Sequence, residues 1–221
     1  MKRLAVTLAL AGIGLAGGAL AETRPVLDYR DQAFRTREPR YSPSERARLD
    51  RAMAEQAPAS LRDEIGRTFV VLGDAAGAFS RQGARERIYL VQASRPVAID
   101  PFPKAVAPVL VLLGEDAPAR FFRLPADVQY QRLVAAADAD RDGRSEVLLE
   151  STFMNMGEVA TAVTAVRLDP DRASAAPVQI LRDVFTDRCD LGAGRRARSA
   201  ATVSLGEGGA FATRLYALGC R

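Results

Sequence analysis

Carboxylates recur at alternate positions in one short stretch of this chain. In a loop that curls round a hard cation, alternate side chains point inward, and a glycine at position 6 permits the sharp turn. Without a cation, carboxylates this close together would repel one another. The sequence therefore predicts a calcium site in this loop, with Gly143 at the turn. Its predicted ligands are the side chains of Asp138, Asp140, Asp142 and Glu146 and the backbone carbonyl of Arg144.

The residues that flank the loop indicate which elements carry it. An EF-hand places a bidentate glutamate at position 12 between two helices, whereas position 12 here is Leu149. The run from Glu146 to Phe153 is short and partly β-branched or aromatic, which favours a strand. The alanine-rich run from Gln131 to Ala137 suits a helix as well as a strand. We expect strand–loop–strand, with helix–loop–helix as the alternative.

The motif Asp-Ala-Asp-Arg-Asp-Gly-Arg-Ser-Glu-Val-Leu-Leu resembles the calcium loop of FG-GAP and VCBS-type repeats. These repeats occur in integrin-like propellers and in many exported bacterial proteins. The resemblance implies a loop between two antiparallel strands, with calcium held by the carboxylates of Asp138, Asp140, Asp142 and Glu146. It covers residues 131–153. A weaker echo runs through residues 69–91, but the loop of that segment lacks the carboxylates.

The N-terminus has the pattern of a secretory signal peptide. A basic start precedes the apolar run from Leu4 to Leu20, and a small-residue cleavage pattern ends at Ala21. A membrane anchor is the weaker alternative, because the run is shorter than the roughly 20 residues that usually span a bilayer. We predict cleavage after Ala21 and a periplasmic or secreted protein without a stable membrane anchor.

The two cysteines, Cys189 and Cys220, are a second feature of an exported protein. An even pair in an oxidising compartment predicts a disulfide. The alternative, a metal or redox pair, would be expected to show a C-x-x-C spacing or histidines, and the chain has neither. We therefore predict that Cys189 and Cys220 are bonded.

The absence of histidine restricts the possible chemistry. It excludes Ser-His-Asp and Cys-His catalysis and histidine-ligated zinc or copper sites. Hydrolysis by paired carboxylates needs no histidine and stays open. The formal net charge is +4, and removal of a leader that contains Lys2 and Arg3 brings the chain closer to neutrality. Together with export, this balance argues against a nucleic-acid partner.

Composition and hydrophobic pattern divide the chain into a leader, an arm, a helical segment and a β-rich domain. Residues 22–41 alternate charges and predict an extended arm or linker. In residues 42–66, Ser42 and Glu45 form a capping-box pattern that predicts a helix, with a second short helical turn from Ala59. Residues 67–221 show short apolar runs between turn signals. The predicted strands are Thr68–Leu72, Arg87–Ala93, Val109–Leu113, Arg120–Leu124, Gln131–Ala137, Val147–Phe153, Val159–Leu168, Val178–Phe185, Ser199–Leu205 and Ala210–Leu218.

The fold class that follows is mainly β: an antiparallel meander with a short N-terminal helix after the signal peptide. The strands could form propeller-like blades, a sandwich or an open barrel. The predicted function is that of an exported, non-catalytic, calcium-stabilised binding or structural domain with a protein or glycan partner. The alternative is a carboxylate-dependent extracellular hydrolase of glycans or phosphoesters, which would need a cleft with two acids outside the calcium loop.

Overall fold

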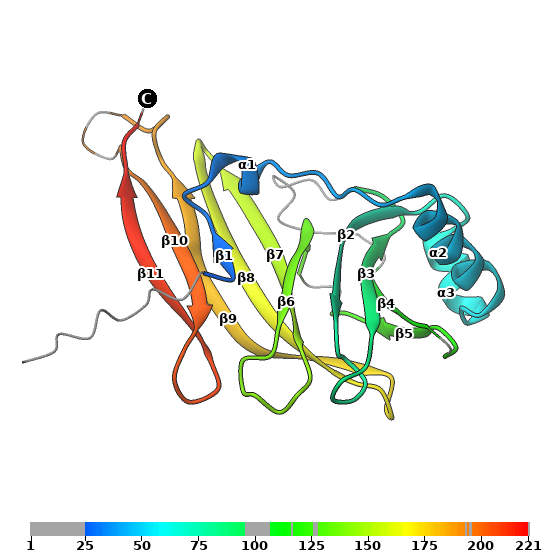
Figure 1. Cartoon of the computed structure of the whole chain (residues 1–221). Coiled ribbons are helices and arrows are strands. Elements are labelled where there is room, and N and C mark those ends of the chain that lie inside the picture. Colours follow the sequence, from blue (N-terminus) through cyan, green and yellow to red (C-terminus); the bar gives the residue numbers. More distant parts are fainter. Residues whose placement is uncertain are drawn as a thin grey trace, which may run out of the picture.

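Strands dominate the structure, and its helices lie in the N-terminal part of the chain (Figure 1). The computed structural model describes residues 25–95, 107–115, 117–125, 128–192, 194 and 196–220, so the predicted leader lies outside the described residues. The helices are α1 (Gln32–Arg35), α2 (Pro43–Glu55) and α3 (Ala59–Ile65). The strands are β1 (Leu27–Asp28), β2 (Val70–Gly77), β3 (Glu86–Gln92), β4 (Val109–Gly114), β5 (Arg120–Arg123), β6 (Arg132–Ala137), β7 (Glu146–Asn155), β8 (Glu158–Asp169), β9 (Ser174–Asp187), β10 (Arg198–Leu205) and β11 (Phe211–Leu218).

Helix α2 begins where the sequence predicts a capped helix. The hydroxyl of Ser42 accepts a hydrogen bond from the backbone N–H of Glu45 (3.2 Å), and the Glu45 carboxylate accepts one from the N–H of Ser42 (2.8 Å). This capping box satisfies donors that a helix start leaves without partners. Leu49 and Met53 are buried, and with α3 they cover the outer face of β2, β3 and β4. None of the helices in the described ranges combines the length and apolar character needed to span a bilayer.

The segment predicted as an extended arm contains two short elements. β1 pairs with β10, where Leu27 lies opposite Val203. Helix α1 follows at once, and the carboxylate of Asp31 caps it by accepting a hydrogen bond from the N–H of Ala33 (2.8 Å). Leu27 and Tyr29 are almost fully buried. The arm is therefore held by the buried side chains of Leu27 and Tyr29.

Eight strands form a nearly closed, barrel-like sheet. They are hydrogen-bonded in the order β2-β3-β4-β5-β9-β8-β7-β6, and the pairs are antiparallel except for the single contact between β5 and β9. The two ends of this path, β2 and β6, come together: a Cβ added at Gly73 would lie 2.3 Å from the carbonyl oxygen of Leu133. β10 and β11 continue the sheet from the C-terminal half of β9, beyond the barrel (Figure 1). The mainly β, antiparallel prediction is confirmed.

The core lies on both faces of this sheet. Side chains such as Phe122 and Val147 fill the inside of the barrel. The outer face of β2, β3 and β4, which includes Tyr89, packs against α2 and α3. The outer face of β7 and β8, which includes Leu148, packs against β1 and β10. Because successive side chains of a strand point to opposite faces, β7 needs an unbroken apolar run to fill both sides.

The β2–β3 and β6–β7 hairpins repeat one arrangement. The last pair before the loop is Gly77↔Glu86 in the first hairpin and Ala137↔Glu146 in the second, an offset of 60 residues (146 − 86). The pairs next to them follow the same offset, and the first strand of each hairpin carries a bulge further from the loop. The echo in residues 69–91 is therefore a structural repeat of the hairpin that bears the carboxylates.

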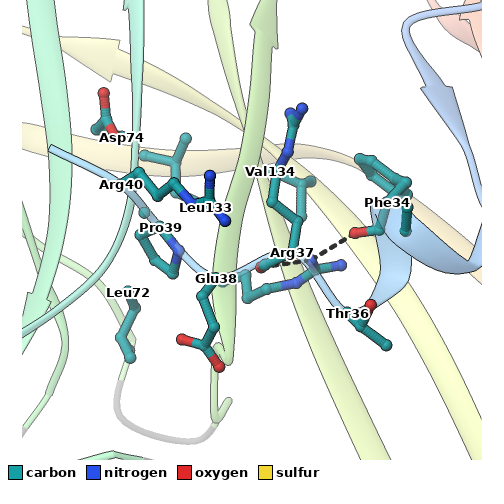
Figure 2. Close-up of a pocket in the computed structure, with 13 residues that line it drawn as sticks. Phe34, Thr36, Arg37, Glu38, Pro39, Arg40, Leu72, Asp74, Leu133 and Val134 are labelled. Atoms are coloured by element: carbon teal, nitrogen blue, oxygen red, sulfur yellow. Dashed lines mark hydrogen bonds between the residues drawn. The ribbon is translucent and has the colours of Figure 1, made fainter.

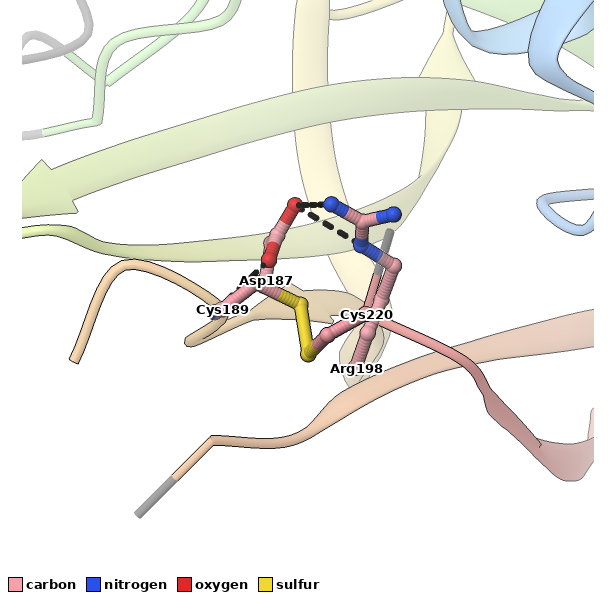
Figure 3. The surroundings of a disulfide bond; sticks show 4 residues. All are labelled: Asp187, Cys189, Arg198 and Cys220. Atoms are coloured by element: carbon pink, nitrogen blue, oxygen red, sulfur yellow. Dashed lines mark hydrogen bonds and ion pairs between the residues drawn. A yellow bond between two sulfur atoms is a disulfide. The ribbon is translucent and has the colours of Figure 1, made fainter. Parts of the chain in front are cut away.

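A disulfide joins the end of β9 to the end of β11, as the sequence predicts. Cys189 and Cys220 are bonded, and Figure 3 shows the ion pair of Asp187 with Arg198 beside them. The cross-link spans a sequence separation of 31 residues, so chain entropy would give it about 3–4 kcal/mol of stabilisation. It fixes the outermost strand at the end of the sheet where β9 and β10 meet.

Candidate metal centre

The predicted calcium loop connects β6 to β7, two antiparallel strands. The strand–loop–strand expectation is confirmed, and Leu149 at position 12 is a buried strand residue. The turn at Gly143 has φ +85°, a conformation that glycine adopts without a steric penalty. The loop therefore has the backbone form that the spacing of its carboxylates predicts.

Three of the four predicted carboxylates come together. One oxygen each from Asp138, Asp140 and Glu146 lie within 4.8 Å of one another. Glu146 is 2% exposed, and one of its oxygens accepts a hydrogen bond from the N–H of Ala139 (3.0 Å). Oδ2 of Asp138 accepts one from the N–H of Gly143 (2.9 Å). Oδ1 of Asp138 is buried and has no hydrogen-bond partner in the described part of the chain.

Arg167 of β8 places a positive charge against this cluster. Its guanidinium donates to Oε1 of Glu146 from Nη2 (2.7 Å) and from Nε (3.1 Å), and it also donates to Oδ2 of Asp140. Desolvation raises the pKa of Asp140, but the N–H of Asp142 and the Arg167 guanidinium outweigh it and hold the pKa below its usual value. The hydrogen bond to Glu146, followed by that to Asp140, raises the pKa of Arg167. The protein thus supplies a cation of its own to these acids.

Asp142, the fourth predicted carboxylate, stays outside the group. Its Oδ1 accepts a hydrogen bond from the backbone N–H of Arg144 (2.8 Å), and its Oδ2 lies 3.4 Å from the Arg144 guanidinium. The side chain of Arg144 therefore folds back onto its own loop, where it partly neutralises Asp142. The geometry brings together positions 1, 3 and 9 of the loop, with position 5 held beside them.

Two neighbouring turns support the loop from outside. The N–H of Ser145 donates to the carbonyl of Ala78 in the β2–β3 loop (2.7 Å). A Cβ added at Gly143 would lie 2.5 Å from Cγ of Gln82 in the same loop. A Cβ added at Gly209, in the β10–β11 turn, would lie 3.0 Å from the Cβ of Asp140. The carboxylate loop is therefore the middle member of three turns at one end of the sheet.

The equivalent loop of the first hairpin shows how the same backbone is held by a single carboxylate. Glu86, at the position of Glu146, accepts hydrogen bonds from the N–H groups of Phe79 and Ser80, both at 2.8 Å. The hydroxyl of Ser80 adds a third at 2.5 Å. Ser80 stands at the position of Asp140, so a neutral donor replaces a carboxylate there. Of these two loops, the β6–β7 loop is the one that brings several carboxylates together, and their repulsion favours a counter-ion.

Sequence reasoning missed Arg167. It lies 21 residues after Glu146 in the sequence. The two residues come together because their neighbours, Val147 of β7 and Val166 of β8, lie opposite each other in the sheet. The available signal was a single arginine within the apolar stretch of residues 165–168 of this strand. Its relation to the loop depends on the register of β8, which the sequence does not specify.

A cavity of about 670 Å³ lies along the line where β2 meets β6. Figure 2 shows the segment from Phe34 to Arg40, which lines this cavity and passes across β6 towards β2. Arg132, on β6, ties this segment down by donating to the carbonyl of Phe34 (2.9 Å). The same guanidinium pairs with Glu150 (2.6 Å). This arrangement closes the barrel from outside.

Comparisons with known proteins add little to this description. No family model matches the chain, and no curated protein matches it. Among solved structures, it is similar to the β-propeller domain of Nup133 from Vanderwaltozyma polyspora, with 9% sequence identity and a TM-score of 0.34. The match covers 66% of this chain and 40% of that chain. Any functional conclusion therefore rests on the geometry of the site.

Proposed function

We propose that this protein is an exported, non-catalytic domain that binds one calcium ion in the β6–β7 loop and serves a binding or structural role. The observation that carries the proposal is Oδ1 of Asp138, a buried carboxylate oxygen without a donor in the described residues. A buried, unpaired carboxylate oxygen is costly, and a cation beside it would remove that cost. The oxygen belongs to a group with Asp140 and Glu146, whose all-oxygen ligand set suits a hard cation.

The residues fit such an ion in number and in kind. Calcium takes about six to eight oxygens in a flexible shell, so carboxylates, the Arg144 carbonyl and water can combine. Arg167 competes for Glu146 and Asp140, and it weakens calcium binding without abolishing the site. An exported protein meets abundant calcium, and even a modest affinity then adds stability.

The position of the loop gives the ion a structural role. Its backbone contacts the β2–β3 loop through Ser145 and the β10–β11 turn through Asp140. A cation held there would brace three turns that are far apart in the sequence. Export is proposed from the leader pattern together with the Cys189–Cys220 bond, which is typical of oxidising compartments. The partner would be a protein or a glycan.

The alternative of a carboxylate-dependent hydrolase gains no specific support from the acids of the cavity beside α1. Such an enzyme needs one acid held protonated beside another that is ionised. Glu150 and Asp187 line one cavity, but each forms an ion pair with an arginine, Arg132 or Arg198. Desolvation raises the pKa of Asp187, yet hydrogen bonds from Arg198 and the N–H of Cys189 hold it below its usual value. Asp187 is therefore not held protonated, and Glu150 is occupied by its ion pair with Arg132.

Isothermal titration calorimetry of the mature protein with calcium chloride tests the proposal. We expect one site per chain, with much weaker binding of magnesium because that ion demands a tighter octahedral shell. Asp138→Asn should weaken calcium binding at least about tenfold, since it removes a charged ligand. Asp171→Asn, an exposed acid in the β8–β9 turn, is the matched control and should leave binding unchanged. The proposal is wrong if calcium gives no saturable heat or if both variants behave alike.

A further inference from the structure

A second cavity, of about 390 Å³, lies at the other end of β7 from the carboxylate loop. Residues of β7, β8 and β9 line it, including Thr152 and Thr161, together with Gln32 and Arg35 of α1. Cavities that hold small ligands begin at about 300 Å³ and combine apolar walls with a few convergent polar groups. This cavity has the size and the kind of lining that such a site requires.

The charges around the cavity do not balance. Three arginines and two acids line it. Arg132 pairs with Glu150 (2.6 Å), and Arg198 pairs with Asp187 (2.6 Å). The remaining cation is Arg35, whose guanidinium has no carboxylate within 4.0 Å in the described ranges. The lining therefore keeps one positive charge without a counter-ion of its own.

Arg35 is held in place by an aromatic ring, and its side chain donates no hydrogen bond to any residue that the structure describes. The guanidinium lies over the ring of Phe185, 4.2 Å from its centroid. A cation–π contact occupies no acceptor, so the N–H donors stay available for a planar anion. Desolvation, and then the charge of Arg198, lower the pKa of Arg35, and the more distant carboxylates of Asp187 and Asp31 offset this only in part. A bound anion would relieve the repulsion between these two arginines.

Hydroxyl and apolar groups complete the lining. The hydroxyls of Thr152 and Thr161 lie 3.1 Å apart, and each retains capacity for a further hydrogen bond. Val159 and Phe185 supply apolar surface beside them, and Gln32 of α1 adds an amide. Such a lining matches a small ligand that carries both hydroxyl groups and apolar C–H surface.

We propose that this cavity binds a small hydroxylated carboxylate, such as a sugar acid, with its carboxylate on Arg35 and its hydroxyls towards Thr152 and Thr161. One uncompensated charge suits a monoanion better than a phosphate dianion. The planar fork of arginine also matches the two oxygens of a carboxylate. The site lies at the opposite end of β7 from the proposed calcium ion and does not depend on it, so it goes beyond the proposed function.

Isothermal titration calorimetry with three probes tests this site: D-glucuronate, D-glucose and inorganic phosphate. The mature protein is titrated at neutral pH and low salt, once in calcium and once in chelator. Failure of the calcium proposal can then be distinguished from failure of the proposal for this cavity. We expect saturable binding of glucuronate in both buffers and at least about tenfold weaker binding of glucose, because glucose lacks the carboxylate.

Three variants localise the binding. Arg35→Gln should weaken glucuronate binding at least about tenfold, and Arg35→Lys should weaken it less because it keeps the charge but loses the fork. Arg182→Gln removes an exposed arginine from the same strand as Phe185, outside the cavity, and should leave binding unchanged. Melting curves confirm that each variant is folded. Equal binding of glucose, preferential binding of phosphate, or glucuronate binding unaffected by Arg35→Gln would each overturn the proposal.

Discussion

At the residue scale, the candidate metal centre is defined by a cation that the sequence motif does not contain. Arg167 contacts Glu146, which is almost fully buried, and Asp140, which is partly exposed. A buried carboxylate without a partner costs more free energy than a salt bridge gains on balance. The main effect of removing the arginine is therefore to leave a buried acid without a partner. Arg167 and calcium would act on the same acids, which makes them competitors.

Arg167→Gln should therefore have opposite effects on stability and on calcium affinity. In chelator, loss of the charged partner of Glu146 should lower the free energy of unfolding by about 1–3 kcal/mol. Calcium should bind more tightly, because a positive charge has left the site. Urea unfolding in chelator and calorimetric titration measure the two effects. Arg172→Gln, which removes an exposed ion pair with Asp169, is the control and should change stability by less than about 1 kcal/mol. A variant that binds calcium no better than the wild type would show that Arg167 is not a competitor.

Tyr89 gives the structure a pH dependence on the alkaline side. Burial beneath α2 and α3 raises its pKa from 10.0 to about 12. Because the folded-state pKa exceeds the unfolded value, the stabilising contribution is complete below pH 10 and is lost as the pH rises from 10 towards 12. Tyr29, whose pKa burial also raises, acts in the same direction. Tyr89→Phe should lose less stability than the wild type between pH 10 and 12 in urea unfolding, and equal losses would contradict this assignment.

At the scale of elements, the two repeated hairpins provide a comparison within one chain. Gly83 and Gly143 occupy the same loop position with positive φ, +71° and +85°. No heavy atom lies within 4 Å of a Cβ built on Gly83, whereas one built on Gly143 would meet the side chain of Gln82. Replacement of Gly83 by alanine therefore costs only backbone strain. Replacement of Gly143 by alanine costs the same strain and also displaces the side chain of Gln82.

Gly83→Ala should lower the free energy of unfolding by about 1–2 kcal/mol, the cost of a left-handed conformation for a residue with a Cβ. Gly143→Ala should lower it further, because Gln82 must move as well. Chemical unfolding of both variants in chelator gives the comparison without a contribution from metal. If the two substitutions cost the same, the packing of the two loops against each other is not as the structure shows.

Much of this level could be predicted from the sequence, because it depends on local signals. The capping box of Ser42, the hairpin turns and the strand after Glu146 are each encoded within a few residues. The closure of the barrel by Gly73 and Leu133 depends on contacts between segments that are distant in sequence. The repeat was partly hidden because the first loop lacks the carboxylates that make the second recognisable. Arg167 was missed because its role depends on strand register, and the open barrel could not be distinguished from propeller-like blades or a sandwich because closure depends on distant contacts.

At the scale of the whole molecule, the two ends of the sheet are stabilised differently. At one end the Cys189–Cys220 bond holds β11 to the end of β9. At the other end three turns meet at the carboxylate loop, where backbone contacts and Arg167 replace a covalent link. Weak, charge-dependent contacts between turns are where a bound cation would contribute most. The central claim is therefore that calcium stabilises the whole domain through this end.

Calorimetric melting of wild-type residues 22–221, in calcium and in chelator, tests that claim most directly. At a hundredfold excess of calcium over its dissociation constant, the free energy of unfolding should rise by about 2.7 kcal/mol. For a chain of this size that corresponds to an increase in Tm of about 5–10 °C, with a much smaller increase in magnesium. A Tm that is the same in calcium and in chelator would show that the loop is held by Arg167 alone and would contradict the account.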